Sequence, residues 1–242
     1  MLYIFLMKIT KYYSPNFDVK ARSSKSITVI VIHYTGMQSE RESLKRLISP
    51  TSKVSCHYLI KRNGDIFSLV EDKNIAWHAG KSMWGKYKNL NKNSIGIELV
   101  NKGHRYGYQA FTKPQIIKLI QLCKNLKKKY MIENKFILGH SDVAPLRKID
   151  PGEKFPWDYL SSKGVGIYPG NVKKIKLFEG NKDVGVFFKN LSKIGYRYLS
   201  RKFQRRIVKN FQRRFRQKKV DGVLDLETLK ISQILAKKSN IA

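Results

Sequence analysis

Acidic residues and cysteines are scarce in this chain of 242 residues. Asp and Glu together number 17 against 49 Lys and Arg, and the only cysteines are Cys56 and Cys123. There is no CxxC pair, which excludes the common cysteine zinc motifs, and no disulfide framework is visible. We interpret both cysteines as free, buried thiols, and they leave the redox compartment open.

Long hydrophobic runs are also missing. The N-terminal apolar run, Leu2–Met7, is too short to cross a bilayer or to form the apolar part of a secretory signal. No small-residue cleavage site and no lipobox-like cysteine accompany it. We therefore expect no transmembrane segment and no recognisable signal peptide, which leaves a cytoplasmic location possible.

The formal net charge is +32, which indicates a polyanionic neighbour such as nucleic acid, an anionic membrane or a cell wall. A genome rich in lysine codons would produce the same composition. No helix-turn-helix, RNP or zinc-finger pattern accompanies the charge, so we expect no specific nucleic-acid partner.

Strand and helix patterns follow one another as far as about residue 138, before an irregular stretch, and we expect the α/β class for this part of the chain. Helical spacing predicts a helix over 40–48 and another that begins after Thr112, with Gln115 completing a capping box. The pair Asn63-Gly64 predicts a hairpin turn with positive φ at both residues. The predicted strands are residues 27–33, 58–62, 65–70, 94–100 and 136–138.

The character of the chain changes near residue 170. Residues 171–242 contain 20 Lys and Arg against 5 Asp and Glu, which gives about twice the net positive charge per residue of the preceding part. Their apolar residues fall at helical spacing, around 186–194, 203–215 and 226–237. We therefore predict two domains, an α/β domain over 1–170 and a small all-helical domain over 171–242.

Three residues have the composition of an open zinc site. His33 and His140 each end a predicted strand, and Asp150 follows ten residues after His140. Two imidazoles and one carboxylate leave a fourth zinc position for water. Three unrelated polar residues could show the same spacing, so the zinc site is a hypothesis.

Two further charged residues are candidates for catalysis. Glu98 interrupts an apolar strand, where a charge is costly unless it is paired or functional, and it could act as a general base. Gly96, on the same face, would leave room for a ligand. Lys148 could stabilise an oxyanion. The alternatives are a solvent-facing glutamate and an ordinary surface lysine.

Residues 71–93 form a polar stretch that is long for a connection and contains Trp77, His78 and Trp84. Such long connections are usually functional or disordered. The aromatic residues favour a function.

Five sequence blocks occur in the order "VIHYTG", "SCHYLIKRNGDI", "AWHAGKSMW", "NKNSIGIELVNKG" and "GHSDVAPLRKIDPGEKFPW". Their order resembles that of a known family. The chain is similar over about 25–165 to the zinc N-acetylmuramoyl-L-alanine amidases of the amidase-2 superfamily, and within it to the AmiD-like branch. This resemblance implies a mixed central β-sheet flanked by helices. The segment 211–229 resembles part of a three-helix peptidoglycan-binding domain, which we expect over 171–242.

The resemblance also implies roles for individual residues. His33, His140 and Asp150 match the zinc ligands, Glu98 the catalytic glutamate, and Lys148 the lysine of the second catalytic motif. T7-type enzymes and catalytic recognition proteins of the superfamily have a tyrosine where this chain has Cys56. AmiD-like enzymes lack that tyrosine and rely on the glutamate, so the departure indicates a branch of the family. His57 is not a ligand in the family. The residues expected to line the muropeptide cleft are Trp77, His78, Asn93 and Arg147, the last near a peptide carboxylate.

The implied function is hydrolysis of the amide between N-acetylmuramic acid and L-alanine, with zinc as cofactor and peptidoglycan or a muropeptide as substrate. The alternative is a non-catalytic peptidoglycan-recognition protein, which typically lacks the third ligand that Asp150 supplies here. The expected wall-binding domain favours the cell envelope, either periplasm or exterior. The oligomeric state stays open.

Overall fold

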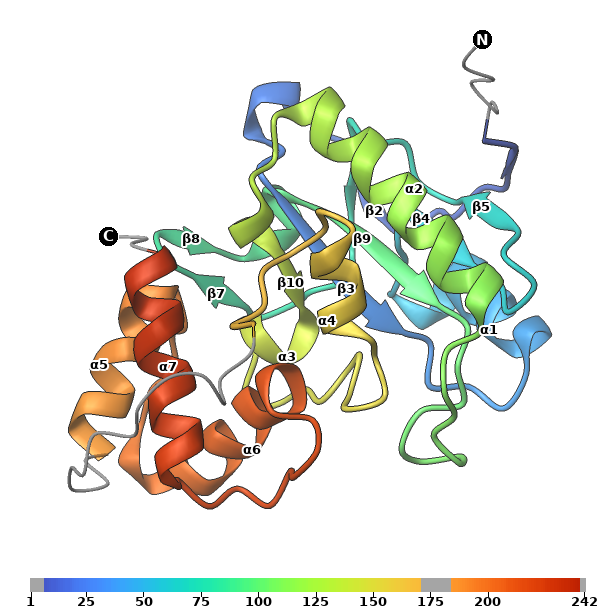
Figure 1. The fold of residues 1–242 in the computed structure, drawn as a ribbon. Coiled ribbons are helices and arrows are strands. Elements are labelled where there is room, and N and C mark those ends of the chain that lie inside the picture. Colours follow the sequence, from blue (N-terminus) through green and yellow to red (C-terminus); the bar gives the residue numbers. More distant parts are fainter. Residues whose placement is uncertain (1–6, 171–183, 240–242) are drawn as a thin grey trace, which may run out of the picture. The chain divides into compact units, whose positions relative to one another are not determined.

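The computed structural model describes residues 7–170 and 184–239 (Figure 1). Most of the apolar N-terminal run and the first residues of the expected helical domain, 171–183, lie outside the described residues. The contacts divide the chain into two compact units, of which the first comprises Met1–His78 and Asn91–Glu133 and the second Ala79–Leu90 and Asn134–Ala242. Among the described residues, no helix has the length and apolarity needed to cross a membrane.

The first unit is built on a mixed sheet. Its five strands follow the order β1-β5-β4-β9-β3, in which β4 and β5 pair antiparallel and the other neighbours pair parallel. These strands are β1 (Ile9–Lys11), β3 (Val29–Tyr34), β4 (Tyr58–Ile60), β5 (Ile66–Ser68) and β9 (Ser94–Leu99). The predicted mixed sheet flanked by helices is confirmed.

The centre of this sheet is buried on both faces. Residues 29–32 of β3 are all fully buried, as are Ile95 and Ile97 of β9. A continuous β-branched run is typical of a parallel strand covered on both sides. Two helices, α1 (Glu40–Ile48) and α2 (Lys113–Tyr130), belong to this unit (Figure 1). Its remaining elements are β2 (Phe17–Asp18), β6 (Ile75–Ala76) and the 3-10 turns Ser24–Ser26, Pro50–Ser52 and Leu90–Lys92. The last turn begins at Leu90, which is assigned to the second unit.

Two local predictions need correction. In the hairpin, Gly64 has φ of 95° but Asn63 does not have a positive φ, because its side chain accepts a hydrogen bond from the Asp65 N–H and the loop is wider than two residues. Thr112 caps α2 as predicted. Gln115 does not complete a capping box, because its buried amide donates instead to the carbonyls of Ile60 and Val100.

The second unit contains the helices predicted near the C-terminus. It includes the short hairpin of β7 (Met83–Trp84) and β8 (Tyr87–Lys88), the 3-10 turns Asn134–Phe136 and Arg201–Phe203, strand β10 (Ile137–Gly139), and helices α3 (His140–Val143), α4 (Trp157–Ser162), α5 (Val184–Ile194), α6 (Gln204–Phe215) and α7 (Leu226–Ser239). The helical character of the described C-terminal part agrees with the prediction.

An aromatic core joins the early and late parts of the second unit. The ring of Trp84 packs edge-on against Tyr196 at 4.8 Å between centroids, and Gly195 lies so close to Trp84 that a Cβ there would meet the indole at 2.5 Å. Phe187 and Phe211 extend the cluster. Residues 184–239 therefore group with residues 134–170 in one compact body.

Candidate metal centre and active site

His33 and Glu98 occupy paired positions on neighbouring strands. The parallel register of β3 and β9 places His33 opposite Glu98, and β4 places Leu59 on the other side of Glu98. Paired residues in a sheet project toward the same face. A buried imidazole and a half-buried carboxylate thus share one face at the carboxyl ends of two central strands.

The ring of His78 fills the space beside Glu98 that the absent side chain of Gly96 leaves. A Cβ on Gly96 would lie 2.4 Å from the ring of His78, so the expectation that this space receives a ligand is wrong. His78 Nδ1 lies 3.1 Å from His33 Nε2, and His78 Nε2 lies 3.2 Å from Ser94 Oγ. Gly96 therefore admits the imidazole that orients His33.

His57 is a structural histidine. Its Nδ1 accepts a hydrogen bond from the Gly96 N–H, and its Nε2 lies 3.1 Å from the carbonyl of Asn74. Burial, and then the charge of Arg22, lower the pKa of His57 to about 3, so that it is neutral near pH 7. The neighbouring Cys56 is fully buried, and burial raises the pKa of its thiol, as it does for Cys123. Both cysteines are free and buried, as predicted.

His140 begins α3 directly after β10, and both of its ring nitrogens have close neighbours. Nε2 lies 3.1 Å from the carbonyl of Ala79, and Nδ1 lies 3.1 Å from Oδ2 of Asp150. A carbonyl only accepts hydrogen bonds, so the proton of a neutral ring belongs on Nε2. Nδ1 then directs a lone pair at a carboxylate, an arrangement that a cation between the two atoms would stabilise.

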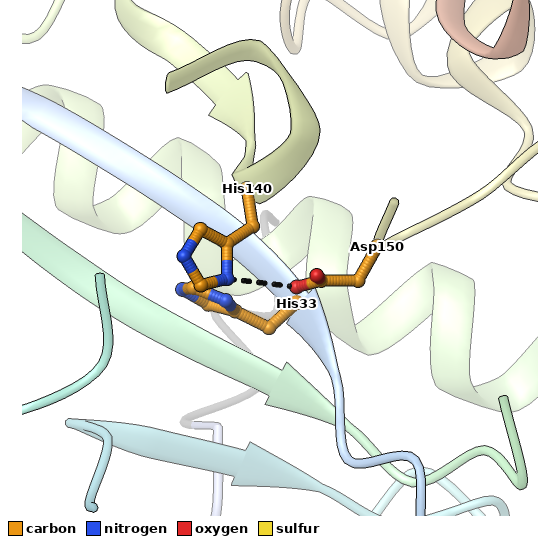
Figure 2. A group of neighbouring side chains, drawn as sticks. All are labelled: His33, His140 and Asp150. Atoms are coloured by element: carbon orange, nitrogen blue, oxygen red, sulfur yellow. Dashed lines mark hydrogen bonds and ion pairs between the residues drawn. The ribbon is translucent and has the colours of Figure 1, made fainter. Parts of the chain in front are cut away.

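His33, His140 and Asp150 come together as the sequence predicts for a metal site (Figure 2). One ligand atom from each lies within 4.8 Å of the other two, and all three side chains are buried. Two imidazole nitrogens and one carboxylate oxygen form a donor set that zinc accepts in open catalytic sites. The residues therefore fit a zinc ion with a free coordination position.

Arg147 and Lys148 lie between His140 and Asp150 in the chain. Nη2 of Arg147 donates to the carbonyls of Ala79 at 2.6 Å and Lys81 at 3.0 Å. Partial burial lowers the pKa of Arg147, and the charge of Asp150 opposes this shift. Lys148 is half-buried. A cavity of about 200 Å³ adjoins Arg147, and its lining residues are Lys81, Ala144, Leu146, Arg147 and Tyr198.

Two predicted cleft residues have other neighbours. Trp77 donates its indole N–H to Asp18 at 2.7 Å. Asn93 donates to the carbonyl of Ser26 at the start of the strand pair, about 16 Å along the strand from Glu98. The structure does not bring Asn93 close to Glu98. Roles in substrate binding for these two residues, and for His78 and Arg147, stay predictions.

The sequence analysis missed a buried polar cluster next to His140. Asp142 accepts hydrogen bonds from the Gly139 N–H, from Tyr196 Oη at 2.6 Å, and from the guanidinium of Arg214. The side chains of Asp142, Tyr196 and Arg214 are almost fully buried. The only local signal is an acidic residue in the first turn of a helix, because Tyr196 and Arg214 lie far away in the sequence.

Comparisons with known proteins give one consistent result. The family model described as N-acetylmuramoyl-L-alanine amidase matches residues 23–153. The chain is 34% identical over 233 residues to the N-acetylmuramoyl-L-alanine amidase AmiD of Escherichia coli, covering 88% of this chain and 83% of that one. It is 37% identical over 168 residues to the 1,6-anhydro-N-acetylmuramyl-L-alanine amidase AmpD of Haemophilus influenzae, covering 62% and 89%.

Solved structures resemble most of this chain. The complex of Escherichia coli AmiD with the substrate anhydro-N-acetylmuramic acid-L-Ala-D-gamma-Glu-L-Lys has a TM-score of 0.80 at 33% identity, covering 90% of this chain and 91% of that one. AmpDh3 of Pseudomonas aeruginosa has a TM-score of 0.81 at 31% identity, covering 93% and 96%. The likeness therefore includes the C-terminal helices as well as the sheet.

Proposed function

Because this chain belongs to the N-acetylmuramoyl-L-alanine amidase family, it is an amidase, and we propose that it works with a zinc ion held by His33, His140 and Asp150. The reaction adds water across the amide between N-acetylmuramic acid and L-alanine. It releases a carboxylate on the lactyl group of the sugar and a free amine on the stem peptide. The convergence of the three ligand atoms within 4.8 Å is the observation that supports the metal most directly.

The bound zinc would lower the pKa of a coordinated water toward neutrality and polarise the scissile carbonyl. Glu98 is the general base in this proposal, since the strand register puts it on the same face as His33. Its carboxylate takes a proton from the attacking water and returns it to the departing amine of L-alanine. Lys148, two residues before Asp150, stabilises the negative charge that develops on the carbonyl oxygen.

The substrate is an anhydromuropeptide or a longer peptidoglycan fragment. The AmiD structure similar to this chain was solved with an anhydro-N-acetylmuramic acid peptide, and a second AmpDh3 structure was solved with an anhydromuramic pentapeptide. We assign Arg147 and the adjoining cavity to a carboxylate of the stem peptide, and Trp77, His78 and Asn93 to the cleft around the substrate.

A muropeptide digest tests this function. The purified chain is incubated with anhydro-N-acetylmuramyl tripeptide, with and without a zinc chelator, and the products are identified by mass spectrometry. We expect free stem peptide without chelator, none with it, and recovery when zinc is restored. If peptide is never released although the muropeptide binds, the chain is a recognition protein and not an amidase.

The C-terminal helical region, residues 184–239, is our candidate for a wall-binding surface. Its positive charge density suits the carboxylates of peptidoglycan stems. Exchange of the exposed residues Arg201, Lys202 and Arg205 for Glu should lower retention on purified sacculi. The matched control exchanges exposed lysines of α2, namely Lys113, Lys124 and Lys128. Equal retention of both variants would contradict a wall-binding surface on the C-terminal region.

A wall-binding surface also favours the cell envelope, either periplasm or exterior, as the location. Cell fractionation with an antibody to the intact protein distinguishes this location from the cytoplasm. Recovery in the cytoplasmic fraction alone would favour a role in recycling internalised muropeptides.

A further inference from the structure

Helix α6 presents two buried polar faces in opposite directions. Asn210 and Arg214 are four residues apart and share one face, and Gln212 and Arg216 share the other, with Arg216 at the C-terminal cap. All four side chains are at most 5% exposed. Buried amides and guanidinium groups need partners, so the partners of each face show what α6 holds in place.

The face of Asn210 and Arg214 contacts the segment 137–155, which contains His140 and Asp150. Arg214 donates to the carboxylate of Asp142 and, at 2.9 Å, to the carbonyl of Ile137. Its guanidinium also lies 4.2 Å from the ring centroid of Trp157. Asp142 is two residues beyond His140 in α3, so Arg214 fixes the short helix that presents His140.

Asn210 donates hydrogen bonds to the same segment close to Asp150, the second proposed metal ligand in that segment. Its Nδ2 donates to the carbonyls of Pro145 at 2.6 Å and Lys148 at 2.9 Å. Lys148 is two residues before Asp150. The Ser141 N–H in turn donates to the Asp150 carbonyl at 2.9 Å, which ties the two ends of the loop together.

Among the described residues, the hydrogen-bond partners of the opposite face of α6 lie in the C-terminal helical region. Gln212 donates to the carbonyl of Val223 and to Thr228, and Arg216 pairs with Asp225 at 2.6 Å. The chain thus provides a comparison within one helix. One amide and guanidinium pair bonds to the segment with His140 and Asp150, and an equally buried pair stabilises the helical region alone.

The segment between α3 and α4 needs outside support. From Ala144 to Pro156 it forms no strand or helix, so few hydrogen bonds of its own backbone fix its shape. Residues that orient metal ligands from outside the coordination sphere typically change metal affinity about 10- to 100-fold when removed. Buried side chains from α6 are among the groups that hold this segment in place, together with the bonds from Arg147 to the carbonyls of Ala79 and Lys81.

We propose that Asn210 and Arg214 of α6 are positioning residues for His140 and Asp150, so that the C-terminal helical region completes the amidase centre in addition to any role in wall binding. This proposal rests on the proposed function in taking His140 and Asp150 as zinc ligands. It assigns to the helical region a part in the chemistry that a wall anchor would not have.

Four variants of the full chain test the proposal. Arg214→Met and Asn210→Leu remove the contacts to the 137–155 segment, and Arg216→Met and Gln212→Leu are the matched controls. Zinc affinity is measured by competition with a chromophoric chelator, and the visible spectrum of the Co²⁺-loaded protein reports ligand geometry. Hydrogen exchange of the apo protein reports opening of the segment without any metal.

We expect Arg214→Met and Asn210→Leu to weaken zinc binding about 10-fold or more, to alter the Co²⁺ spectrum and to speed exchange across 137–155. The controls should lower the melting temperature but leave zinc affinity within about twofold of the parent, since they do not contact that segment. If Arg214→Met does not fold, Arg214→Lys replaces it, because lysine keeps the charge but not the paired donors.

Zinc affinity that falls equally in all four variants, or in none, would overturn the positioning role and leave the amidase function untouched. A parent chain that binds neither zinc nor Co²⁺ would instead overturn the proposed metal centre. In that case the exchange rates still decide whether α6 fixes the segment.

Discussion

His33 and Glu98 lie on regular strands, whereas His140, Lys148 and Asp150 lie on an irregular segment with one short helix. The strand residues are placed by a six-residue parallel register that sets which side chains face each other. The segment residues are placed by side chains from α6, which lie some 60 to 77 residues further along the chain. The two groups therefore depend on different kinds of interaction.

Substitutions should therefore affect the two groups of site residues differently. Backbone hydrogen bonds in a buried ladder survive most side-chain changes, because every residue supplies the same donor and acceptor. A segment held by a few buried side chains depends on each of them, since the loss of one leaves a buried partner unsatisfied. Changes of ligands should have the largest effects on either group, and changes in their supports smaller ones.

The largest effect is expected for Asp150→Ala, which removes a ligand from the irregular segment. Zinc content should fall well below one ion per chain, and muropeptide hydrolysis should be lost. Metal analysis of the purified variant measures this directly. The control is Asp158→Ala at an exposed position of α4. Undiminished zinc in Asp150→Ala would remove Asp150 from the ligand set.

Glu98→Gln changes the proposed general base on strand β9 without removing a metal ligand. The amide keeps the size of the side chain but cannot accept a proton, so turnover should fall about 10²- to 10⁴-fold while zinc and substrate still bind. Steady-state kinetics with a zinc assay on the same sample measures both. The exposed pair member Glu71 provides the control Glu71→Gln. Turnover within a few-fold of the parent would exclude Glu98 as the base, and His78 would be the next candidate.

A pair of glycine variants compares the supports of the two groups. In Gly96→Ala the new Cβ meets the His78 ring at 2.4 Å, and in Gly139→Ala it meets Cδ of Pro151 at 2.8 Å. Neither glycine has a positive φ, so crowding alone is tested. We expect each to lose about 1–3 kcal/mol of stability, with the larger loss in Gly96→Ala. Thermal unfolding and zinc affinity of both check this, and a larger loss in Gly139→Ala would contradict it.

The smallest effect concerns pH and the buried His57. Its folded pKa of about 3 lies below the unfolded value of 6.5, so between these values the unfolded chain binds a proton that the folded chain does not. Above about pH 6.5 His57 therefore does not reduce the free energy of unfolding. Below that pH, its titration lowers this free energy by roughly 1.4 kcal/mol per pH unit. Urea unfolding of the parent and His57→Gln at pH 7 and pH 5 measures this. The parent should lose more stability than the variant, and equal losses would show that His57 does not titrate on unfolding.

The sequence by itself determined the local elements and most of the chemistry. The β-branched runs of β3 and β9, the Thr112 cap of α2 and the helical spacing after residue 184 are patterns within a few residues, and local backbone preferences follow from them. The three candidate ligands could be recognised as well, since His33 and His140 stand where strands end, Asp150 follows close behind His140, and all three residue types suit zinc. Their convergence then followed from the fold.

Only the tertiary structure decided which side chains fill the spaces and satisfy the buried groups. His78 occupies the space above Gly96, 18 residues away in the chain, and Arg214 pairs with Asp142 across 72 residues. Gln115 likewise turns from its own helix cap to the carbonyls of Ile60 and Val100. A buried polar group takes whichever partner the packed chain brings within reach, and that choice depends on distances in space that no local pattern of residues contains.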